Sequence, residues 1–274
     1  MVNCEPIKEQ FTVHSSQFTM KRIGIALSGG GARGIAHIGV LQALAENGIY
    51  PESISGASAG ALVGALYAAG QSPQEMLKFV KDSSLLKLFK IGLPLNGLAK
   101  LTYVRDQLKA IIPHDDFGQL QRRLFVAIAN LNSGECEMRG EGILSEVVMA
   151  SCSIPLVFKP VEINGNWYVD GGLLNNMPVA PLLPHSDILI GVNVIPHVKT
   201  ASKNVQNIIG IATRCFELSI LSNTNASIQM CQVVIEPKRV QAFNIFQFNQ
   251  YEKLFDIGYQ AAMEKMPEIK KLIC

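Results

Sequence analysis

Apolar residues occur along this chain in two patterns, as short continuous runs and as longer segments with a helical repeat. The continuous runs, which are typical of buried strands, lie at 22–27, 53–57, 124–130, 187–194 and 231–235. The helical repeat predicts helices over 32–46, 59–69, 73–82, 103–112, 144–152 and 203–230, and a last one from about residue 250. Strands that alternate with helices predict an α/β fold, in which helices cover both faces of a mostly parallel central sheet.

Turn signals complete this pattern. Asn-Ser-Gly at 132–134 separates the run at 124–130 from an expected partner strand at 135–139. Asn-Gly at 164–165 predicts a hairpin over 161–169.

The chain contains no linker, internal repeat or low-complexity segment after its first residues. We expect the polar stretch 1–19 to be an N-terminal extension and 20–274 to be a single domain. Within this domain the chemical motifs lie in a core at 22–194, and a helical C-terminal part covers 199–274.

Composition narrows the class of protein. Of the 274 residues, 48% are hydrophobic and 17% are charged, which indicates a compact folded chain. A net charge of +2 without a dense cluster of Lys and Arg gives no support for nucleic-acid binding. The six cysteines include no Cys-x-x-Cys pair and the five histidines no His-x-x-x-His pair, so no metal site is expected.

The sequence also bears on location. Residues 1–19 lack the apolar segment of a cleaved secretory signal, and the scattered cysteines favour a reducing compartment. The uncharged stretch 53–74 predicts a buried helix and not a membrane span, because its helix is too short to cross a bilayer. We expect a cytoplasmic protein; peripheral contact with membranes and export without a cleaved signal stay open.

The first candidate for chemistry is the sequence Gly56-Ala57-Ser58-Ala59-Gly60, between a predicted strand and a predicted helix. A serine with glycine two positions before and after it is typical of a nucleophile elbow. The serine backbone is strained in such a turn, and side chains at the two glycine positions would collide. The serine hydroxyl then lies at a helix N-terminus, where N–H groups stabilise an anion. The alternative without function is a glycine-lined turn with a buried serine.

The second candidate is the glycine-rich loop at 28–34, between the first strand and the first helix. Its Gly-x-Gly-x-x-Gly spacing also fits a dinucleotide site, but that site requires an acidic residue about twenty positions on, where this chain has the elbow. A phosphate-binding P-loop is excluded because no Lys-Ser/Thr pair follows the last glycine. The remaining interpretation is an oxyanion hole made of backbone N–H groups. The candidate donors are Gly29, Gly30, Gly31, Ala32 and Ala59.

The third candidate is Asp170, which ends the predicted hairpin strand. Gly171 and Gly172 follow it and let the chain turn away at once. An aspartate that only caps its own turn is the alternative.

Together these motifs resemble those of the patatin-like phospholipase family. The matching sequences are Gly-Gly-Gly-Ala-Arg-Gly at 29–34, Gly-Ala-Ser-Ala-Gly at 56–60 and Asp-Gly-Gly at 170–172, with Asn176-x-Pro178 and the segment 150–155 in support. The resemblance covers about residues 22–194, and the order of the motifs is more specific than any one of them.

The resemblance implies a lipid acyl-ester hydrolase of the phospholipase A or lysophospholipase type, without a metal or an organic cofactor. Ser58 is then the nucleophile, and Asp170 is the base that takes its proton. Arg33 is expected either to neutralise a substrate phosphate or to fix the loop through an ion pair, and Asn176 to brace the turn at Asp170. The glycines expected to shape these turns are Gly34, Gly56, Gly60, Gly171 and Gly172.

A Ser–His–Asp triad is the rival mechanism, because His185 and His197 both follow Asp170 in the order that α/β-hydrolases use. Both resemble ordinary loop histidines, and His37 resembles a packed residue of the first helix. We therefore favour a dyad in which Asp170 and Ser58 are in direct hydrogen-bond contact.

The expected partners are lipid acyl esters, either phospholipid or lysophospholipid. Residues 78–100 mix lysines with bulky apolar side chains, which suits transient contact with anionic lipid. A packed helix followed by a loop with solvated lysines is the alternative for this stretch. Two other functions stay open, a weakly active or non-catalytic lipid-binding or regulatory protein on the same fold, and an acyltransferase. The sequence does not determine the oligomeric state.

Overall fold

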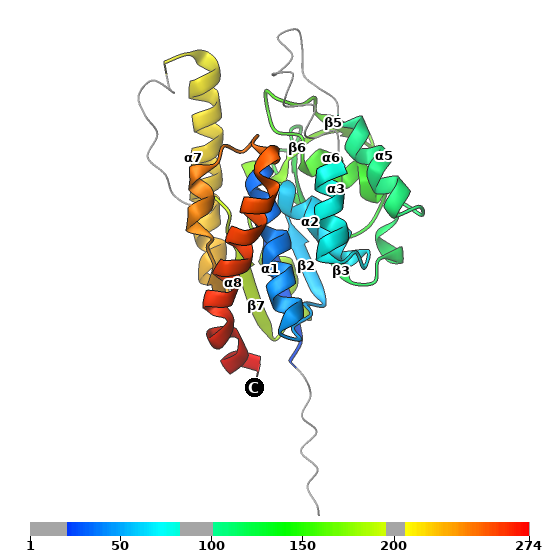
Figure 1. Cartoon of the computed structure of the whole chain (residues 1–274). Coiled ribbons are helices and arrows are strands. Elements are labelled where there is room, and N and C mark those ends of the chain that lie inside the picture. The colour runs from blue at the N-terminus through cyan, green and yellow to red at the C-terminus, as the bar shows by residue number, and fades with distance from the viewer. Residues whose placement is uncertain (1–20, 83–100, 196–205, 274) are drawn as a thin grey trace, which may run out of the picture.

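The computed structural model describes residues 21–82, 101–195 and 206–273, and these residues form a mixed sheet flanked by helices (Figure 1). The sheet has eight strands in the order β5-β6-β3-β2-β1-β7-β8, and β4 pairs with β3 beside this path. The strands are β1 (Ile23–Leu27), β2 (Ser53–Gly56), β3 (Arg123–Asn130), β4 (Cys136–Arg139), β5 (Val161–Ile163), β6 (Asn166–Asp170), β7 (Ile188–Val192) and β8 (Val233–Ile235).

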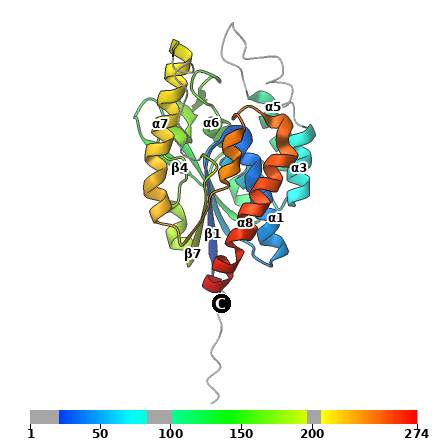
Figure 2. The same cartoon turned by 60° about the vertical axis from the view of Figure 1, so that its left-hand side comes forward.

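Helices cover both faces of the sheet. The helices of the described ranges are α1 (Ile35–Glu46), α2 (Ala59–Ala68), α3 (Pro73–Asp82), α5 (Thr102–Ile111), α6 (Leu144–Ser151), α7 (Ile208–Gln229) and α8 (Tyr251–Ile273). The short 3-10 helix η1 (Gly31–Gly34) precedes α1. Helices α1, α3 and α8 lie on one side of the sheet, and α7 lies on the other (Figure 2). The predicted α/β fold is confirmed.

The centre of the sheet is parallel and its margin is antiparallel. Strands β1 and β7 pair in parallel and are buried along their whole length, as expected for strands covered on both faces. The antiparallel part consists of the two predicted hairpins, β3–β4 and β5–β6, and the pairing of β6 with β3. Asn164 and Gly165 both have positive φ, 51° and 80°, as the tight turn of the second hairpin requires.

One edge of β3 is shared by β2 and β6, and this register positions the candidate residues. Gly56 of β2 pairs with Val126 of β3, and Asp170 of β6 pairs with Ile128. Strand β4 pairs with β3 at both positions and so occupies the opposite edge. Since β2 runs parallel and β6 antiparallel to β3, the carboxyl ends of β2 and β6 face each other. The turn that follows β2 therefore lies beside Asp170.

Helix α7 differs from the helix predicted over 203–230. It begins at Ile208, because the side chain of Asn207 accepts a hydrogen bond from the N–H of Gly210 at 2.8 Å and caps the helix. Residues 203–205 lie outside the described residues. Ile208, the first residue of the helix, is 85% exposed.

The expected lipid-contact stretch at 78–100 falls mostly outside the described residues. Its first part, 78–82, belongs to α3, where Phe79 is buried in the core and Lys78 is exposed. Residues 83–100 are not among those described. None of the helices in the described ranges combines the length and the apolar character that crossing a bilayer requires.

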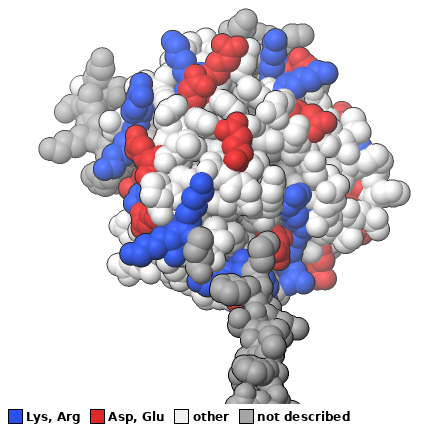
Figure 3. All heavy atoms as spheres, turned by 60° about the horizontal axis from the view of Figure 1, so that its bottom comes forward, with Lys and Arg blue, Asp and Glu red and all other residues white. Residues whose placement is uncertain are grey.

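Charged side chains are mixed by sign on the end of the molecule that faces downward in Figure 1. Figure 3 shows this face, on which Lys and Arg are interspersed with Asp and Glu. The carboxyl ends of the parallel strands, and with them the candidate site, lie at the other end of the sheet.

Candidate active site

Ser58 lies in the sharp turn between β2 and α2, with φ 52° and ψ −123°. A positive φ is strained for a residue with a side chain, and it persists only where neighbouring contacts enforce it. A Cβ at Gly56 would lie 2.5 Å from the carbonyl carbon of Gly60, and a Cβ at Gly60 would lie 2.2 Å from the carbonyl oxygen of Leu27. The predicted elbow is present, and both flanking glycines have the steric reason that the sequence indicated.

The Ser58 side chain lies close enough to the Asp170 carboxylate to favour its ionised form and lower its pKa. Both residues are buried, with exposed fractions of 6% and 2%. Asp170 Oδ1 also accepts from the N–H of Gly172 at 2.8 Å, and the N–H of Asp170 donates to the carbonyl of Ser153 at 3.0 Å. The structure brings together the two side chains that the sequence singled out, and a direct hydrogen bond between them stays a prediction.

The surroundings of Asp170 make its carboxylate a stronger base. Burial raises the pKa of Asp170 to about 7, and the Ser58 side chain and the hydrogen bond from Gly172 oppose this rise. An aspartate in water has a pKa near 3.9 and accepts a hydroxyl proton poorly. With a pKa near neutrality, Asp170 is ionised in a large fraction of molecules and still has appreciable proton affinity.

Two consecutive side chains at the end of α6 hold the backbone of Ser58. Ser151 Oγ accepts from the N–H of Ser58 at 2.9 Å and donates to the carbonyl of Ala127 at 2.7 Å. Cys152 Sγ donates to the carbonyl of Ser58 at 3.3 Å. The segment 151–153 therefore contacts both the serine and the aspartate, because the carbonyl of its last residue accepts from Asp170. Sequence reasoning noted this segment but not these contacts.

The glycine-rich loop packs directly against the elbow. A Cβ at Gly29 would lie 3.1 Å from Ser58 Cβ, and a Cβ at Gly34 would lie 2.5 Å from Ala59 Cβ. Residues without side chains allow this close approach. The loop and the elbow follow the adjacent strands β1 and β2, which pair in parallel up to Leu27, so both lie at the carboxyl end of the sheet.

The structure separates the candidate N–H donors into two groups. The N–H of Gly29 donates to the carbonyl of Asn176 at 3.1 Å, and that of Ala32 donates to the carbonyl of Ile245 at 2.7 Å. In the described part of the chain, no acceptor binds the N–H groups of Gly30, Gly31 and Ala59. These three N–H groups remain candidate donors.

Arg33 fixes the loop to a distant segment. Its Nε donates to the carbonyl of Phe243 at 2.9 Å, next to the contact that Ala32 makes with Ile245. Burial lowers the pKa of Arg33, and the negative charge of Glu217 opposes this. Arg33 was expected either to bind a substrate phosphate or to fix the loop through an ion pair. The structure shows a contact that fixes the loop, but it is a hydrogen bond to a carbonyl and not an ion pair.

Asn176 is fully buried between the aspartate turn and the glycine-rich loop. Its carbonyl accepts from Gly29, and its N–H donates to Asn223 Oδ1 at 2.8 Å. Its side-chain Nδ2 donates to Thr224 Oγ1 at 3.4 Å, whereas its Oδ1 has no hydrogen-bond partner among the described residues. The bracing expected of Asn176 therefore runs through its main chain and toward α7.

His185 lies at the wrong end of the sheet for a triad. Ser53, the first residue of β2, donates through Oγ to the carbonyl of His185 at 3.4 Å, whereas Ser58 follows the other end of β2. The imidazole stacks on Phe125 with ring centroids 5.6 Å apart and contacts Arg123. The Ser–His–Asp alternative is wrong for His185.

His37 does not support a triad either. His37 is fully buried in α1, and its Nε2 lies 2.8 Å from the carbonyl oxygen of Ser28, which positions it beneath the glycine-rich loop. Burial lowers the pKa of His37 to about 4, so the ring is neutral at pH 7. His197 lies outside the described residues.

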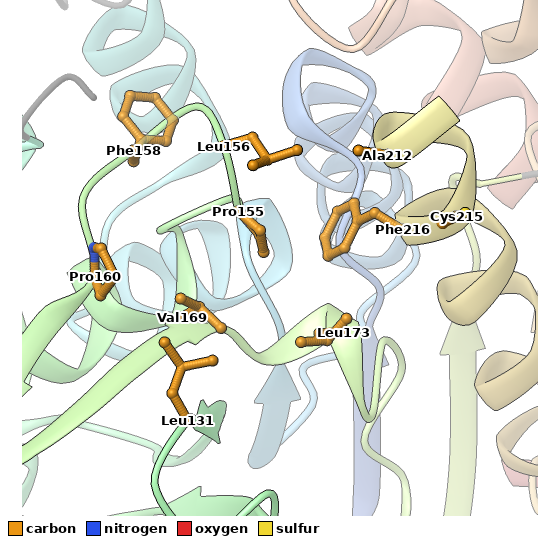
Figure 4. A pocket seen from close by; sticks show the side chains of 10 residues that line it. All are labelled: Leu131, Pro155, Leu156, Phe158, Pro160, Val169, Leu173, Ala212, Cys215 and Phe216. Carbon is orange, nitrogen blue, oxygen red and sulfur yellow. The ribbon is translucent and has the colours of Figure 1, made fainter. Parts of the chain in front are cut away.

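An apolar cavity of about 410 Å³ borders the aspartate turn. In Figure 4, the loop residues 155–156 lie opposite Ala212 and Phe216 of α7, with Val169 and Leu173 below them. Val169 immediately precedes Asp170, and Leu173 follows the two glycines. The lining residues are Leu131, Pro155, Leu156, Phe158, Pro160, Val169, Leu173, Ala212, Cys215 and Phe216. Such a lining favours an aliphatic ligand over a polar one.

Comparison with known proteins agrees with these observations. The family model described as Patatin-like phospholipase matches residues 25–183. An uncharacterised NTE family protein of Mycobacterium bovis is 33% identical over 176 residues, which are 63% of this chain and 49% of that protein. Lysophospholipase NTE1 of Cryptococcus neoformans var. neoformans is 34% identical over 178 residues, which are 59% of this chain and 10% of that protein.

A solved structure shares the fold. Human GIVD cytosolic phospholipase A2, in complex with methyl gamma-linolenyl fluorophosphonate, superposes with a TM-score of 0.50 at 12% sequence identity. The match covers 93% of this chain and 58% of that one. The chain spans about half the length of its mycobacterial relative. Because the family model covers more than half of the chain, this protein belongs to the patatin-like phospholipase family.

Proposed function

We propose that this chain is a lipid acyl-ester hydrolase of the phospholipase A or lysophospholipase type, which forms an acyl intermediate on Ser58. One observation carries the proposal: a serine in a strained elbow lies beside a buried carboxylate whose pKa is raised to about 7. Such a pair is an activated nucleophile with its base. Membership of the family and the apolar cavity support a lipid ester as the substrate.

The first half of the reaction acylates the serine. Asp170 takes the proton of the Ser58 hydroxyl as Oγ forms a bond to the ester carbonyl carbon. The bond from that carbon to the alcohol oxygen then breaks, and the proton on Asp170 passes to the departing oxygen. An alcohol leaves more readily than an amine, which suits a dyad whose base is a carboxylate.

The second half releases the acid. Asp170 takes a proton from water as the water oxygen attacks the acyl-serine carbonyl. The bond to Ser58 Oγ breaks, the fatty acid leaves, and the proton returns to the serine. An alcohol in place of water gives acyl transfer with the same intermediate.

The negative oxygen of each tetrahedral intermediate requires donors that are not already in use. We assign this role to the N–H groups of Gly30, Gly31 and Ala59, which lie at the start of η1 and α2. Removing one such donor raises a barrier by about 3–4 kcal/mol. The acyl chain fits the cavity next to Val169, where apolar side chains replace water around it.

A panel of esters tests this function. The protein is incubated with a nitrophenyl ester, a lysophospholipid, a diacyl phospholipid and a triacylglycerol, and released fatty acid is quantified. We expect fatty acid from at least one glycerophospholipid, and an acyl adduct on Ser58 detectable by mass spectrometry after rapid quenching. Release should stop after treatment with an alkyl fluorophosphonate.

Two results would contradict the hydrolase. Binding of lipid without turnover or adduct supports a lipid-binding protein, and formation of acylated glycerol in preference to free acid when glycerol is added supports an acyltransferase.

The Ser151 hydroxyl offers a further prediction. Ser151→Ala removes the hydroxyl that binds both the buried N–H of Ser58 and the carbonyl of Ala127, so the elbow loses this support. We expect kcat to fall about 10- to 100-fold with little change in KM, because the nucleophile moves relative to its base. Kinetics on the nitrophenyl ester measure both constants.

Ser153→Ala is the matched control for this variant. Ser153 is equally buried and follows the same helix, and its Oγ donates to the carbonyl of Met149. Its main-chain carbonyl, which accepts from the N–H of Asp170, is kept in the variant. A similar loss of kcat in both variants would mean that Ser151 acts only through general stability.

A further inference from the structure

Helix α7 lies outside the stretch that the family model matches, yet polar side chains on it point at the candidate site. The sequence indicated a generic helix there, with no motif. Ser219 Oγ donates to the carbonyl of Leu173 at 2.7 Å. One turn later, Asn223 Nδ2 donates to the carbonyl of Gly172 at 3.0 Å and lies 3.3 Å from that of Leu173.

Asn223 also contacts a second segment. Its Oδ1 accepts from the N–H of Asn176 at 2.8 Å. The side-chain amide of Asn223 therefore donates through Nδ2 to the turn after Asp170 and accepts through Oδ1 from Asn176, which follows that turn. Asparagine is suited to this position because its short side chain has both a donor and an acceptor.

Two residues that Asn223 contacts, Gly172 and Asn176, also make a hydrogen bond to the proposed base or to the glycine-rich loop. Gly172, whose carbonyl Asn223 holds, donates its N–H to Asp170 Oδ1 at 2.8 Å. Asn176, whose N–H Asn223 holds, accepts through its carbonyl from the N–H of Gly29 in the glycine-rich loop. The side chain of Asn223 thus lies between the base and the loop with the proposed oxyanion donors.

We propose that Asn223 is a positioning residue, which fixes the Asp170 turn and the glycine-rich loop relative to each other from α7. This inference rests on the proposed function, because the distance between the Asp170 turn and the glycine-rich loop matters only if both act on one substrate. It extends the site beyond residue 183, into a helix whose sequence resembles no motif of the family.

The observed contacts distinguish this role from simple packing. A side chain that only filled space could be replaced by an apolar one of similar size, such as leucine. Leucine at 223 would leave the N–H of Asn176 and the carbonyl of Gly172 without these partners. Aspartate would keep the acceptor for Asn176, lose the donor to Gly172 and add a negative charge near Asp170.

The experiment compares Asn223→Ala and Asn223→Asp with Asn225→Ala. Asn225 is the same residue type on the same helix, is exposed, and has no side-chain hydrogen bond to the described residues. We expect Asn223→Ala to lower kcat on a nitrophenyl ester about 10-fold or more with KM nearly unchanged, and Asn225→Ala to match the wild type. Asn223→Asp should lose at least as much.

A titration provides a readout that does not depend on turnover. The hydrogen bond from Gly172 lowers the pKa of Asp170, so a looser turn should raise it further. Carboxyl carbon NMR of wild type and Asn223→Ala should show the Asp170 midpoint moving to higher pH in the variant. The acid limb of the kcat/KM profile should move in the same direction.

The outcomes separate this inference from the proposed function. An inactive wild type would contradict the function, whereas the NMR midpoint would still test the positioning. An active wild type with Asn223→Ala equal to Asn225→Ala in kcat and in midpoint would overturn the positioning role alone. If Asn223→Ala fails to fold, Asn223→Asp and Ser219→Ala repeat the comparison. The proposal is overturned if both of these variants fold and keep the kcat of the wild type.

Discussion

Replacement of Asp170 by asparagine should lower kcat by about 10²- to 10⁴-fold and at the same time stabilise the fold at pH 8. The loss follows from the chemistry, because an amide cannot take the proton of the Ser58 hydroxyl. The side chain keeps its size, and its Oδ1 can still accept from the N–H of Gly172. The variant therefore tests the base without dismantling the turn.

The gain in stability follows from the direction of the pKa shift. The pKa of Asp170 is about 7 in the folded protein and near 3.9 in an unfolded chain, so the folded state binds the proton more tightly. The stability that this proton contributes is complete below pH 4 and is lost as the pH rises to 7. The asparagine of the Asp170→Asn variant carries no ionisable group and avoids this loss.

Thermal unfolding of both proteins between pH 5 and pH 8 measures the effect. The advantage of Asp170→Asn over the wild type should grow by about 2–3 kcal/mol across this range. The kcat/KM of the wild type should fall below about pH 7, where Asp170 becomes protonated. An advantage that stays constant with pH, or a wild type fully active at pH 5, would contradict a buried base with a raised pKa.

The local turns of the site could be predicted from the sequence because steric demands are local. Only glycine tolerates the contacts between positions 56 and 60, so the elbow is visible in five letters. The loop at 28–34 is visible for the same reason. The pairing of Ser58 with Asp170 came from the resemblance to a family, and the shared edge of β3 supplies its physical cause.

The supports of the site could not be predicted, because they join ordinary residues from distant segments. Nothing in the sequence distinguishes Ser151 from Ser153, yet one hydroxyl bonds to Ser58 and the other to its own helix. Asn223 and Asn225 present the same difficulty, since only the packing of α7 against the Asp170 turn separates them.

The hydrophobic pattern also leaves the neighbour of an apolar face undetermined. Ala212 and Phe216 lie on one side of a long helix, and they line a cavity. Phe79 belongs to a stretch for which lipid contact and a packed helix were both open, and it lies in the core. Periodicity indicates which side of a helix is apolar, but the tertiary arrangement decides whether core, ligand or solvent covers it.

The choice of oxyanion donors illustrates a further limit. Five nearby N–H groups were candidate donors in the sequence, and hydrogen bonds to Asn176 and Ile245 engage two of them. Which amides stay free depends on carbonyls that come from other parts of the chain. The free set, at Gly30, Gly31 and Ala59, therefore emerges only from the fold.

Replacement of Ser58 by alanine should have the largest effect, with kcat reduced about 10⁵- to 10⁶-fold, to the background of the assay. The hydroxyl forms the acyl bond, so no other group in the described site can replace it. Cys152, the neighbouring thiol, donates to the carbonyl of Ser58, and burial strongly raises its pKa, which disfavours the reactive thiolate. Adduct formation with a fluorophosphonate should disappear together with turnover.

Ser58→Gly is a second variant with a distinct expectation. Alanine keeps a Cβ at φ 52°, whereas glycine adopts this conformation without strain. Both variants should be inactive, but Ser58→Gly should be the more stable by about 1 kcal/mol. Denaturant unfolding measures the difference, and equal stability would mean that the elbow is not strained. A folded Ser58→Ala protein that still releases fatty acid would show that another nucleophile, or water activated directly by Asp170, performs the reaction.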